Sequence, residues 1–251
     1  MGLLGTLAPT GPLPLMAAES GSGRDPAADG RLRARPLRRA LSDTAAQKSG
    51  GHVLGLTGPR DGLIHVPPGY DADSPAPWSM TTSGAGGRAE QLMPLLSPIA
   101  EEYGCLLAAP ESRGRTWDVI LGAYGPDVQT IDRMLAQIFA RWSVDPARVA
   151  IGGFSDGASY ALSLGLINGD LFQRVLAYSP GFTAPTAAHG LPQFYVSHGT
   201  DDPVLPVERT SRRIVPQLRE AGYEVRYHEF EGGHTVLPEI ARESAEWFLG
   251  T

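Results

Sequence analysis

The chain has 251 residues, of which 42% are hydrophobic and 19% charged, a composition that fits one large folded domain with a sizeable core. The formal net charge of −6 argues against nucleic acid as the main partner. A single cysteine excludes an internal disulfide, and no apolar run approaches the length of a membrane span.

The N-terminal region differs in composition from the rest of the chain. Residues 1–29 cluster Gly, Pro, Ser and Asp with low aromatic content, which predicts a flexible or disordered leader before a domain over residues 30–251. Because residues 1–23 contain no Lys or Arg, they make a poor secretory signal, and a cytoplasmic location is the default expectation. Residues 24–48 hold seven basic and three acidic residues, which we interpret as a solvated segment or an edge strand.

Hydrophobic periodicity predicts strands and helices that alternate along the chain. Short edge strands are expected at 31–35 and 63–66, because both segments alternate and both stop at a proline. Further strands are expected at 78–82, 105–109, 148–152, 174–178, 194–197 and 224–230. Helices are expected at 89–103, 126–142, from the turn after 155 to about 167, 207–221 and 237–249. This alternation predicts a mostly parallel, doubly wound sheet with helices on both faces.

The segment Gly153-Phe154-Ser155-Asp156-Gly157 lies between an apolar strand-like run and a helix-like run. That is the context of a nucleophile elbow, a turn so tight that side chains two positions either side of the serine would clash. The Ser155 hydroxyl would then stand at the carboxyl edge of the sheet. The Asp156 amide, at a helix N-terminus, would point at an oxyanion. The alternative is a loop or helix-capping serine.

Two partners for this serine follow it along the chain. Asp202 and His234 each come after a strand-like segment, and His234 lies in a glycine-rich turn. A histidine titrates close to neutral pH, so it can take the serine proton and return it to the leaving group. An aspartate would orient the imidazole and stabilise its cation. Spacing alone leaves the adjacent Asp201 open as the acid.

Together these segments resemble the α/β-hydrolase serine esterases, in particular the phospholipase/carboxylesterase group, which is related to poly(3-hydroxybutyrate) depolymerase-like and acyl-thioesterase proteins. The similar segments lie within residues 60 to 251, at 84–87, 112–118, 153–157, 198–204 and 233–234. The resemblance implies an α/β-hydrolase fold, and its pattern His-Gly-x-x-Asp selects Asp202 over Asp201. Relatives commonly have His-Gly where this chain has Ser83-Gly84, a departure that affects the oxyanion loop and leaves the triad intact.

The oxyanion hole needs a second donor beside the Asp156 amide. The resemblance places it in the 84–86 loop, with the Ala85 amide as the candidate. Gly84 and Trp117 are candidates for contact with the substrate. Trp117 either walls an acyl pocket or packs its own loop, and Arg113 either meets an anionic group or pairs with a nearby aspartate.

The expected activity is hydrolysis of a small-molecule acyl ester through an acyl-enzyme. The same machinery would cleave thioesters, lysophospholipids or polyester oligomers, and a catalytically impaired hydrolase fold used for binding is the alternative from another class. We expect no metal and no cofactor, because ligand residues do not cluster and neither HExxH nor a phosphate loop is present. Cys105 is expected to be a core residue rather than a nucleophile.

Overall fold

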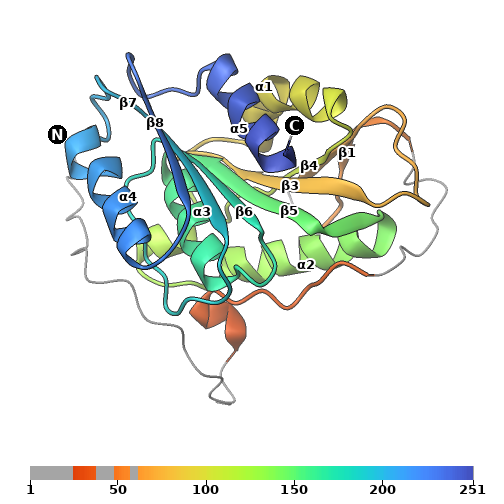
Figure 1. The fold of residues 1–251 in the computed structure, drawn as a ribbon. Coiled ribbons are helices and arrows are strands. Elements are labelled where there is room, and N and C mark those ends of the chain that lie inside the picture. Colours follow the sequence, from red (N-terminus) through yellow and green to blue (C-terminus); the bar gives the residue numbers. More distant parts are fainter. Residues whose placement is uncertain (1–24, 38–47, 57–61, 251) are drawn as a thin grey trace.

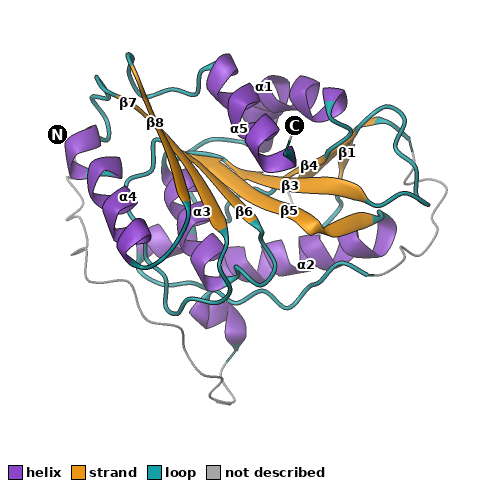
Figure 2. Cartoon of the chain, in the orientation of Figure 1, coloured by secondary structure: helices purple, strands orange, loops and turns teal. Residues whose placement is uncertain are grey.

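A computed structural model describes residues 25–37, 48–56 and 62–250, which form one sheet with helices on both faces (Figures 1 and 2). The strands are β1 (Gly50–Val53), β2 (Leu63–Val66), β3 (Ala76–Thr82), β4 (Leu106–Ala109), β5 (Val144–Phe154), β6 (Arg174–Tyr178), β7 (Gln193–Gly199) and β8 (Val225–Phe230). The α-helices are α1 (Ala89–Glu102), α2 (Pro126–Arg141), α3 (Asp156–Ile167), α4 (Ser211–Glu220) and α5 (Pro238–Leu249). Short 3-10 helices cover Pro26–Asp29 (η1), Asp118–Leu121 (η3) and Val207–Arg209 (η4).

The strand order is β1-β2-β4-β3-β5-β6-β7-β8. Strands β3 to β8 are parallel, whereas β1 and β2 join the sheet antiparallel at one edge. The predicted fold class, an α/β-hydrolase with a mostly parallel doubly wound sheet, is therefore confirmed. Since β3, β5, β7 and β8 run in the same direction, the loops that follow them meet at one edge of the sheet.

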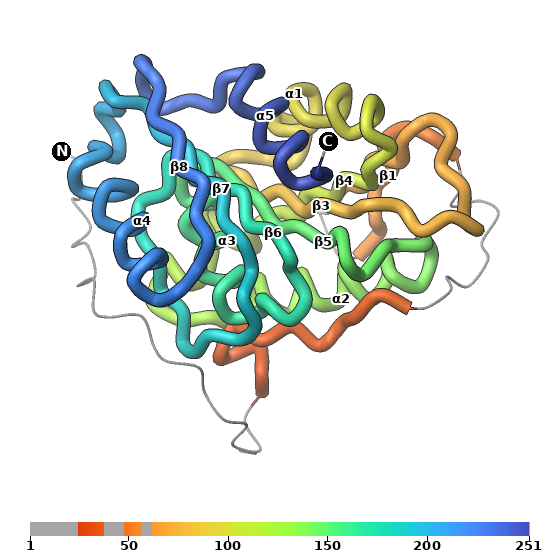
Figure 3. The backbone as a smooth tube through the Cα atoms, in the orientation of Figure 1, coloured from red at the N-terminus to blue at the C-terminus, as the bar shows by residue number. Residues whose placement is uncertain are grey.

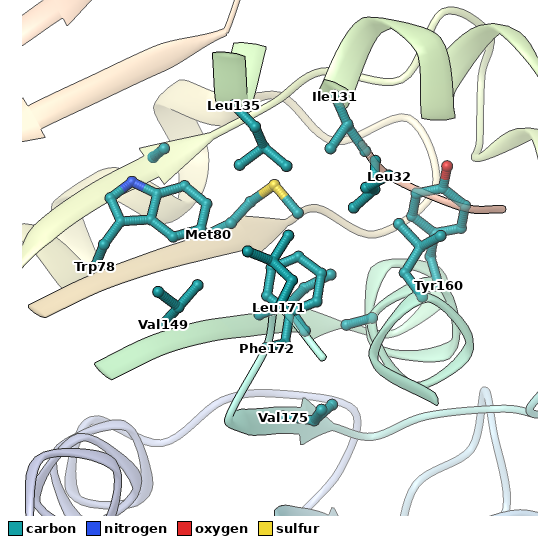
Figure 4. Close-up of a cluster of buried hydrophobic side chains, with 14 of the residues drawn as sticks. Leu32, Trp78, Met80, Ile131, Leu135, Val149, Tyr160, Leu171, Phe172 and Val175 are labelled. Carbon is teal, nitrogen blue, oxygen red and sulfur yellow. The ribbon is translucent and has the colours of Figure 1, made fainter. Parts of the chain in front are cut away.

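The core has two layers, one on each face of the sheet. Helices α2, α3 and α4 cover one face, and α1 and α5 cover the other (Figure 1). Along β3, Trp78 and Met80 point into the first layer, where Figure 4 shows them near Leu135 and Val149. Helix α3 lies beneath β5 and β6 and is buried on every side, which fixes the start of this helix firmly against the sheet.

The predicted edge strand at 31–35 is wrong, because this segment crosses the helices instead of pairing with a strand. Its backbone amides find side-chain acceptors: the Leu32 amide donates to Asn168 Oδ1 at 2.9 Å, and the amides of Arg33 and Ala34 donate to Asp132 Oδ1. Figure 3 shows the segment running beneath α2. Because these backbone amides donate to side-chain oxygens, the segment does not depend on a neighbouring strand for its hydrogen bonds.

Other expectations differ from the structure at their edges. The strand β1 was not predicted, since Gly50 and Gly51 carry no apolar alternation. The helix expected over 207–221 is broken at Thr210, whose hydroxyl donates to the Pro206 carbonyl between η4 and α4. Of the leader expected over 1–29, residues 26–29 form η1 against α2 with Asp25 as its N-cap, and residues 1–24 lie outside the described part of the chain.

Cys105 begins the run into β4 and is buried on the α1 and α5 side of the sheet. Burial raises the pKa of its thiol to about 12, so it stays protonated and apolar at neutral pH. This confirms its place in the core. Within the described residues, no helix combines the length and apolar character needed to cross a bilayer.

Candidate active site

The elbow after β5 has the backbone that its glycines predict. Ser155 has φ 58° and ψ −121°, a left-handed conformation that costs energy in a non-glycine residue and that clusters at functional sites. A Cβ on Gly153 would collide with the Gly157 carbonyl and with Thr82 Oγ1, and a Cβ on Gly157 would collide with the Thr82 carbonyl. The predicted clash is therefore confirmed, and the atoms that cause it belong to Gly157 in α3 and to Thr82 at the end of β3.

The structure brings Ser155, His234 and Asp202 into one chain of hydrogen bonds. His234 Nε2 lies 2.8 Å from Ser155 Oγ, and His234 Nδ1 lies 2.6 Å from Asp202 Oδ2. An ionised carboxylate can only accept, so the proton is on Nδ1 and Nε2 accepts from the serine hydroxyl. The Phe154 ring packs 4.7 Å from the imidazole and limits its rotation.

Asp202 is held by backbone and side-chain donors. Its Oδ1 accepts from the amides of Val204 and Leu205, both at 2.8 Å, and its side chain is fully buried. Burial by itself would raise the pKa of Asp202, but the Leu205 amide, His234 and the Val204 amide outweigh it and the pKa is lowered. The carboxylate is thus ionised at neutral pH. No carboxylate-to-His234 bond involves Asp201, whose side chain is exposed.

His198 lies four residues before Asp202 and packs against it. Its Nε2 lies 2.7 Å from the Leu205 carbonyl and 3.2 Å from Asp202 Oδ2, and its Nδ1 lies 2.7 Å from Ser211 Oγ. Since a carbonyl only accepts, Nε2 carries the proton and Nδ1 accepts from Ser211. Burial lowers the pKa of His198, which keeps this imidazole neutral beside the carboxylate.

Among the described residues, the backbone amides of Ala85 and Asp156 are two of those near Ser155 that have no protein acceptor. The neighbouring amides are already used, because Gly86 donates to the Arg115 carbonyl and Gly87 to the Gly84 carbonyl. Gly84 packs on the serine, where an added Cβ would lie 3.3 Å from Ser155 Cβ. Ala85 is exposed and Asp156 is half-buried, so these two amides are candidates for binding an anion at the nucleophile.

Trp117 lies behind the 84–87 loop and is 1% exposed, which offers a substrate little surface. Its ring stacks on Tyr160 at 4.7 Å, and its Nε1 donates to the Ser83 carbonyl at 2.8 Å. Of the two readings, the structure places this side chain in loop packing. The Arg113 amide donates to Asp127 Oδ1 at 2.6 Å, so a buried carboxylate closes the same loop.

Comparison with known proteins shows which proteins this chain is similar to. Residues 126–248, just under half of the chain, match the model of the phospholipase/carboxylesterase family. Acyl-protein thioesterase 1 of Gibberella zeae is 31% identical over 114 residues, a match that spans 41% of this chain and 48% of that relative. The chain therefore covers about half the length of the relative that it matches.

Solved structures carry the same fold. Esterase PE8 superposes with a TM-score of 0.61 at 22% identity over 76% of this chain and 97% of that one. A thermostable esterase gives a TM-score of 0.63 at 21% identity, covering 81% of this chain and 62% of that one. These likenesses show that the chain has the α/β-hydrolase fold. The ferulic acid esterase of Anaeromyces mucronatus also shares the fold, with a TM-score of 0.61 at 15% identity over 81% and 91% of the two chains.

Sequence reasoning missed two contacts of this α/β-hydrolase. Thr116 Oγ1 donates to Asp156 Oδ2 at 2.7 Å, and Thr82 Oγ1 lies 2.9 Å from the Gly152 carbonyl and 2.8 Å from the Gly157 carbonyl. Thr116 lies in the 112–118 segment and Thr82 ends a predicted strand, but neither contact follows from a local pattern, so only the tertiary arrangement finds them. Within the residues that the structure describes, no group of three or more His, Cys, Asp or Glu side chains is placed to hold a metal ion.

Proposed function

We propose that this α/β-hydrolase cleaves carboxylic esters through an acyl-enzyme, with Ser155 as nucleophile, His234 as base and Asp202 as orienting acid. The observation that carries the proposal is the unbroken relay of 2.8 Å and 2.6 Å from the serine oxygen to the buried carboxylate. A free serine hydroxyl is a weak nucleophile, and a hydrogen-bonded base removes its proton as it attacks.

In the first step Ser155 Oγ attacks the carbonyl carbon of the ester and its proton passes to His234 Nε2. The carbonyl oxygen becomes an oxyanion, which the amides of Ala85 and Asp156 stabilise. The Asp202 carboxylate holds the Nδ1–H tautomer and stabilises the imidazolium that forms. His234 then protonates the departing alcohol, which leaves an acyl group on Ser155.

In the second step a water molecule replaces the alcohol. His234 takes a proton from the water as it attacks the acyl carbon, and the same two amides stabilise the second oxyanion. Collapse of the intermediate breaks the bond to Ser155, returns the proton to its oxygen and releases the carboxylic acid. Each residue acts twice and ends in its starting state.

Two fold neighbours support this chemistry. One is a fluorophosphonate-binding serine hydrolase of Staphylococcus aureus, and another is an esterase of Thermogutta terrifontis phosphorylated by paraoxon. Both reagents are attacked by an activated serine. A thioester is the second candidate substrate, because the relative from Gibberella zeae is an acyl-protein thioesterase. The lysophospholipid and polyester alternatives use the same residues.

The deciding experiment uses 4-nitrophenyl acetate with the wild-type chain and Ser155→Ala. We expect a burst of nitrophenolate and steady turnover from the wild type and neither from the variant. A fluorophosphonate probe should label the wild type once, with the adduct on the Ser155 peptide. An adduct on another serine contradicts the triad. No turnover and no labelling would instead favour the binding-protein alternative. A matched series of acyl esters and acyl thioesters then ranks the two substrate classes by kcat/KM.

A further inference from the structure

Thr82 is the last residue of β3 and is completely buried under the elbow. Its hydroxyl oxygen lies within hydrogen-bond distance of two carbonyls, those of Gly152 at 2.9 Å and Gly157 at 2.8 Å. These two carbonyls belong to β5 before the nucleophile and to α3 after it. One hydroxyl proton is therefore shared between the two arms of the turn that carries Ser155.

The same residue fills the space that the two glycines leave open. In the sheet register Thr82 stands opposite Gly153, where any Cβ would collide with Thr82 Oγ1. On the other arm, a Cβ on Gly157 would collide with the backbone carbonyl of Thr82. The contact is thus a close fit on both sides, and the threonine cannot shift without moving the turn.

Thr82 is also followed directly by the loop that carries Ala85. The next carbonyl, that of Ser83, is held by Trp117, and the following residue, Gly84, packs on the serine. The Ala85 amide comes one residue later, while the Asp156 amide is adjacent to Gly157. The Thr82 side chain therefore connects the segment that carries the Ala85 amide to the segment that carries the Asp156 amide.

We infer that Thr82 is a positioning residue that sets the spacing of the two oxyanion donors, a role that rests on the function proposed above. Its hydroxyl locks the end of β3 to the elbow, so the amides of Ala85 and Asp156 converge on one point beside Ser155 Oγ. Preorganised donors stabilise a developing charge only while their geometry holds, and small displacements lower the rate sharply.

The test removes the hydroxyl while keeping the shape. Thr82→Val should lower kcat on 4-nitrophenyl acetate by roughly tenfold to a hundredfold, the size expected when oxyanion donors are displaced, with KM within about twofold. The inhibition constant of phenylboronic acid, whose serine adduct places an oxygen among the donors, should rise by a similar factor. The midpoint of the pH–rate profile should stay unchanged, because the relay to Asp202 is untouched.

Two matched comparisons separate this role from general packing. Thr81→Val makes the same change at the preceding buried residue, which lines a small apolar cavity against α1 and α5 and makes no bond to the elbow, and should leave kcat unchanged. Thr82→Ser and Thr82→Ala both lose the methyl group, so the ratio of their kcat values measures the effect of the hydroxyl alone. This comparison remains available even if Thr82→Val does not fold. We expect the kcat of Thr82→Ser to stay within about threefold of wild type, and the kcat of Thr82→Ala to fall as far as that of Thr82→Val.

A Thr82→Val or Thr82→Ala variant with wild-type kcat would overturn the inference. So would a kcat loss accompanied by a shifted pH midpoint and unchanged boronic acid affinity, since that pattern places the effect on His234. If the wild type and Thr81→Val neither turn over ester nor react with fluorophosphonate, the proposed function itself fails and this role falls with it. If the wild type and Thr81→Val are active and Thr82→Val has the same kcat as both, only the positioning role is refuted.

Discussion

The indole nitrogen of Trp117 donates a hydrogen bond to the backbone carbonyl of Ser83 at 2.8 Å. These residues lie on the loops after β4 and β3, and Ser83 is two residues before Ala85. The bond holds the Ser83 carbonyl in the loop that carries the candidate donor Ala85. A tryptophan on a neighbouring loop thereby fixes the start of this loop.

Replacing Trp117 with phenylalanine should keep the stack on Tyr160 and leave the Ser83 carbonyl without a donor. We expect a loss of stability of about 1–3 kcal/mol, typical of an unsatisfied buried carbonyl, and a fall in kcat of about tenfold as the loop shifts. Urea unfolding and steady-state kinetics measure the two effects. Trp78→Phe is the control, because that buried indole nitrogen has no hydrogen-bond partner. Equal kcat losses in the two variants would contradict the role of the bond.

The acid is tested by comparing Asp202→Asn with Asp201→Asn. Asp202 accepts from His234 and two amides, so its replacement should lower kcat by about 10⁴, the loss seen when a triad aspartate is amidated. Asp201 is exposed, and its replacement should change kcat by less than about twofold, as for a surface site. Rates from active-site-titrated enzyme measure both. A reversed order would move the acid by one residue.

His198 should make stability depend on pH. Burial lowers its pKa below the ordinary value, so between the folded and unfolded pKa values the unfolded chain binds more protons. The contribution of His198 to stability is therefore complete above about pH 6.5 and is lost as the pH falls through the folded pKa. Melting temperatures between pH 7 and pH 5 should fall more in the wild type than in His198→Gln.

The comparison variant for this pH effect is His228→Gln, because that ring is 38% exposed and lies on the edge strand β8. It measures what replacing an exposed histidine does to the melting temperature. If His198→Gln kept the wild-type pH dependence, the buried imidazole would not be the source of the acid sensitivity.

The N-terminal boundary of the domain is the fourth prediction. Arg31 and Arg35 both pair with Asp170, at 2.8 Å and 2.6 Å, and Leu32 is 2% exposed. Before them, Ala27 is buried and Gln129 Nε2 donates to Asp25 Oδ2 at 2.9 Å, so we propose a boundary near residue 25 instead of residue 30. A chain that begins at residue 25 should melt close to the full chain, and one that begins at residue 38 should melt about 5 °C lower or more. Burial of Leu32 alone contributes about 2 kcal/mol, and each kcal/mol shifts Tm by about 2–4 °C.

Asp170→Asn isolates the charge pairs in this segment. Burial would raise the pKa of Asp170, but the two arginines outweigh it and lower the pKa. Its stabilisation is therefore present above about pH 4, the unfolded value, and is lost as the pH falls through the folded pKa. The variant should melt below the wild type at pH 7 and converge with it in acid. A constant difference at all pH values would show that the arginines are not the cause.

The sequence by itself determined the order of strands and helices from residue 63 onward and the identity of the elbow. Apolar periodicity is a local property, and a glycine two positions either side of a serine records a steric limit that any homologous turn must meet. The chain order of Ser155, Asp202 and His234 could be read in the same way, because each follows a strand that ends at one edge of the sheet.

Tertiary structure alone decided how those residues are supported. Thr82 bonds to the carbonyls of Gly152 and Gly157, about seventy residues away along the chain. His198 bonds to Ser211, the first residue of α4. Residues 31–34 bond to Asp132 and Asn168 instead of a strand. A hydroxyl or amide oxygen has many partners available in a sequence, and its hydrogen bond exists only where the packed chain brings one of them within about 3 Å. Local pattern predicts which groups could react, and packing determines which groups hold them in place.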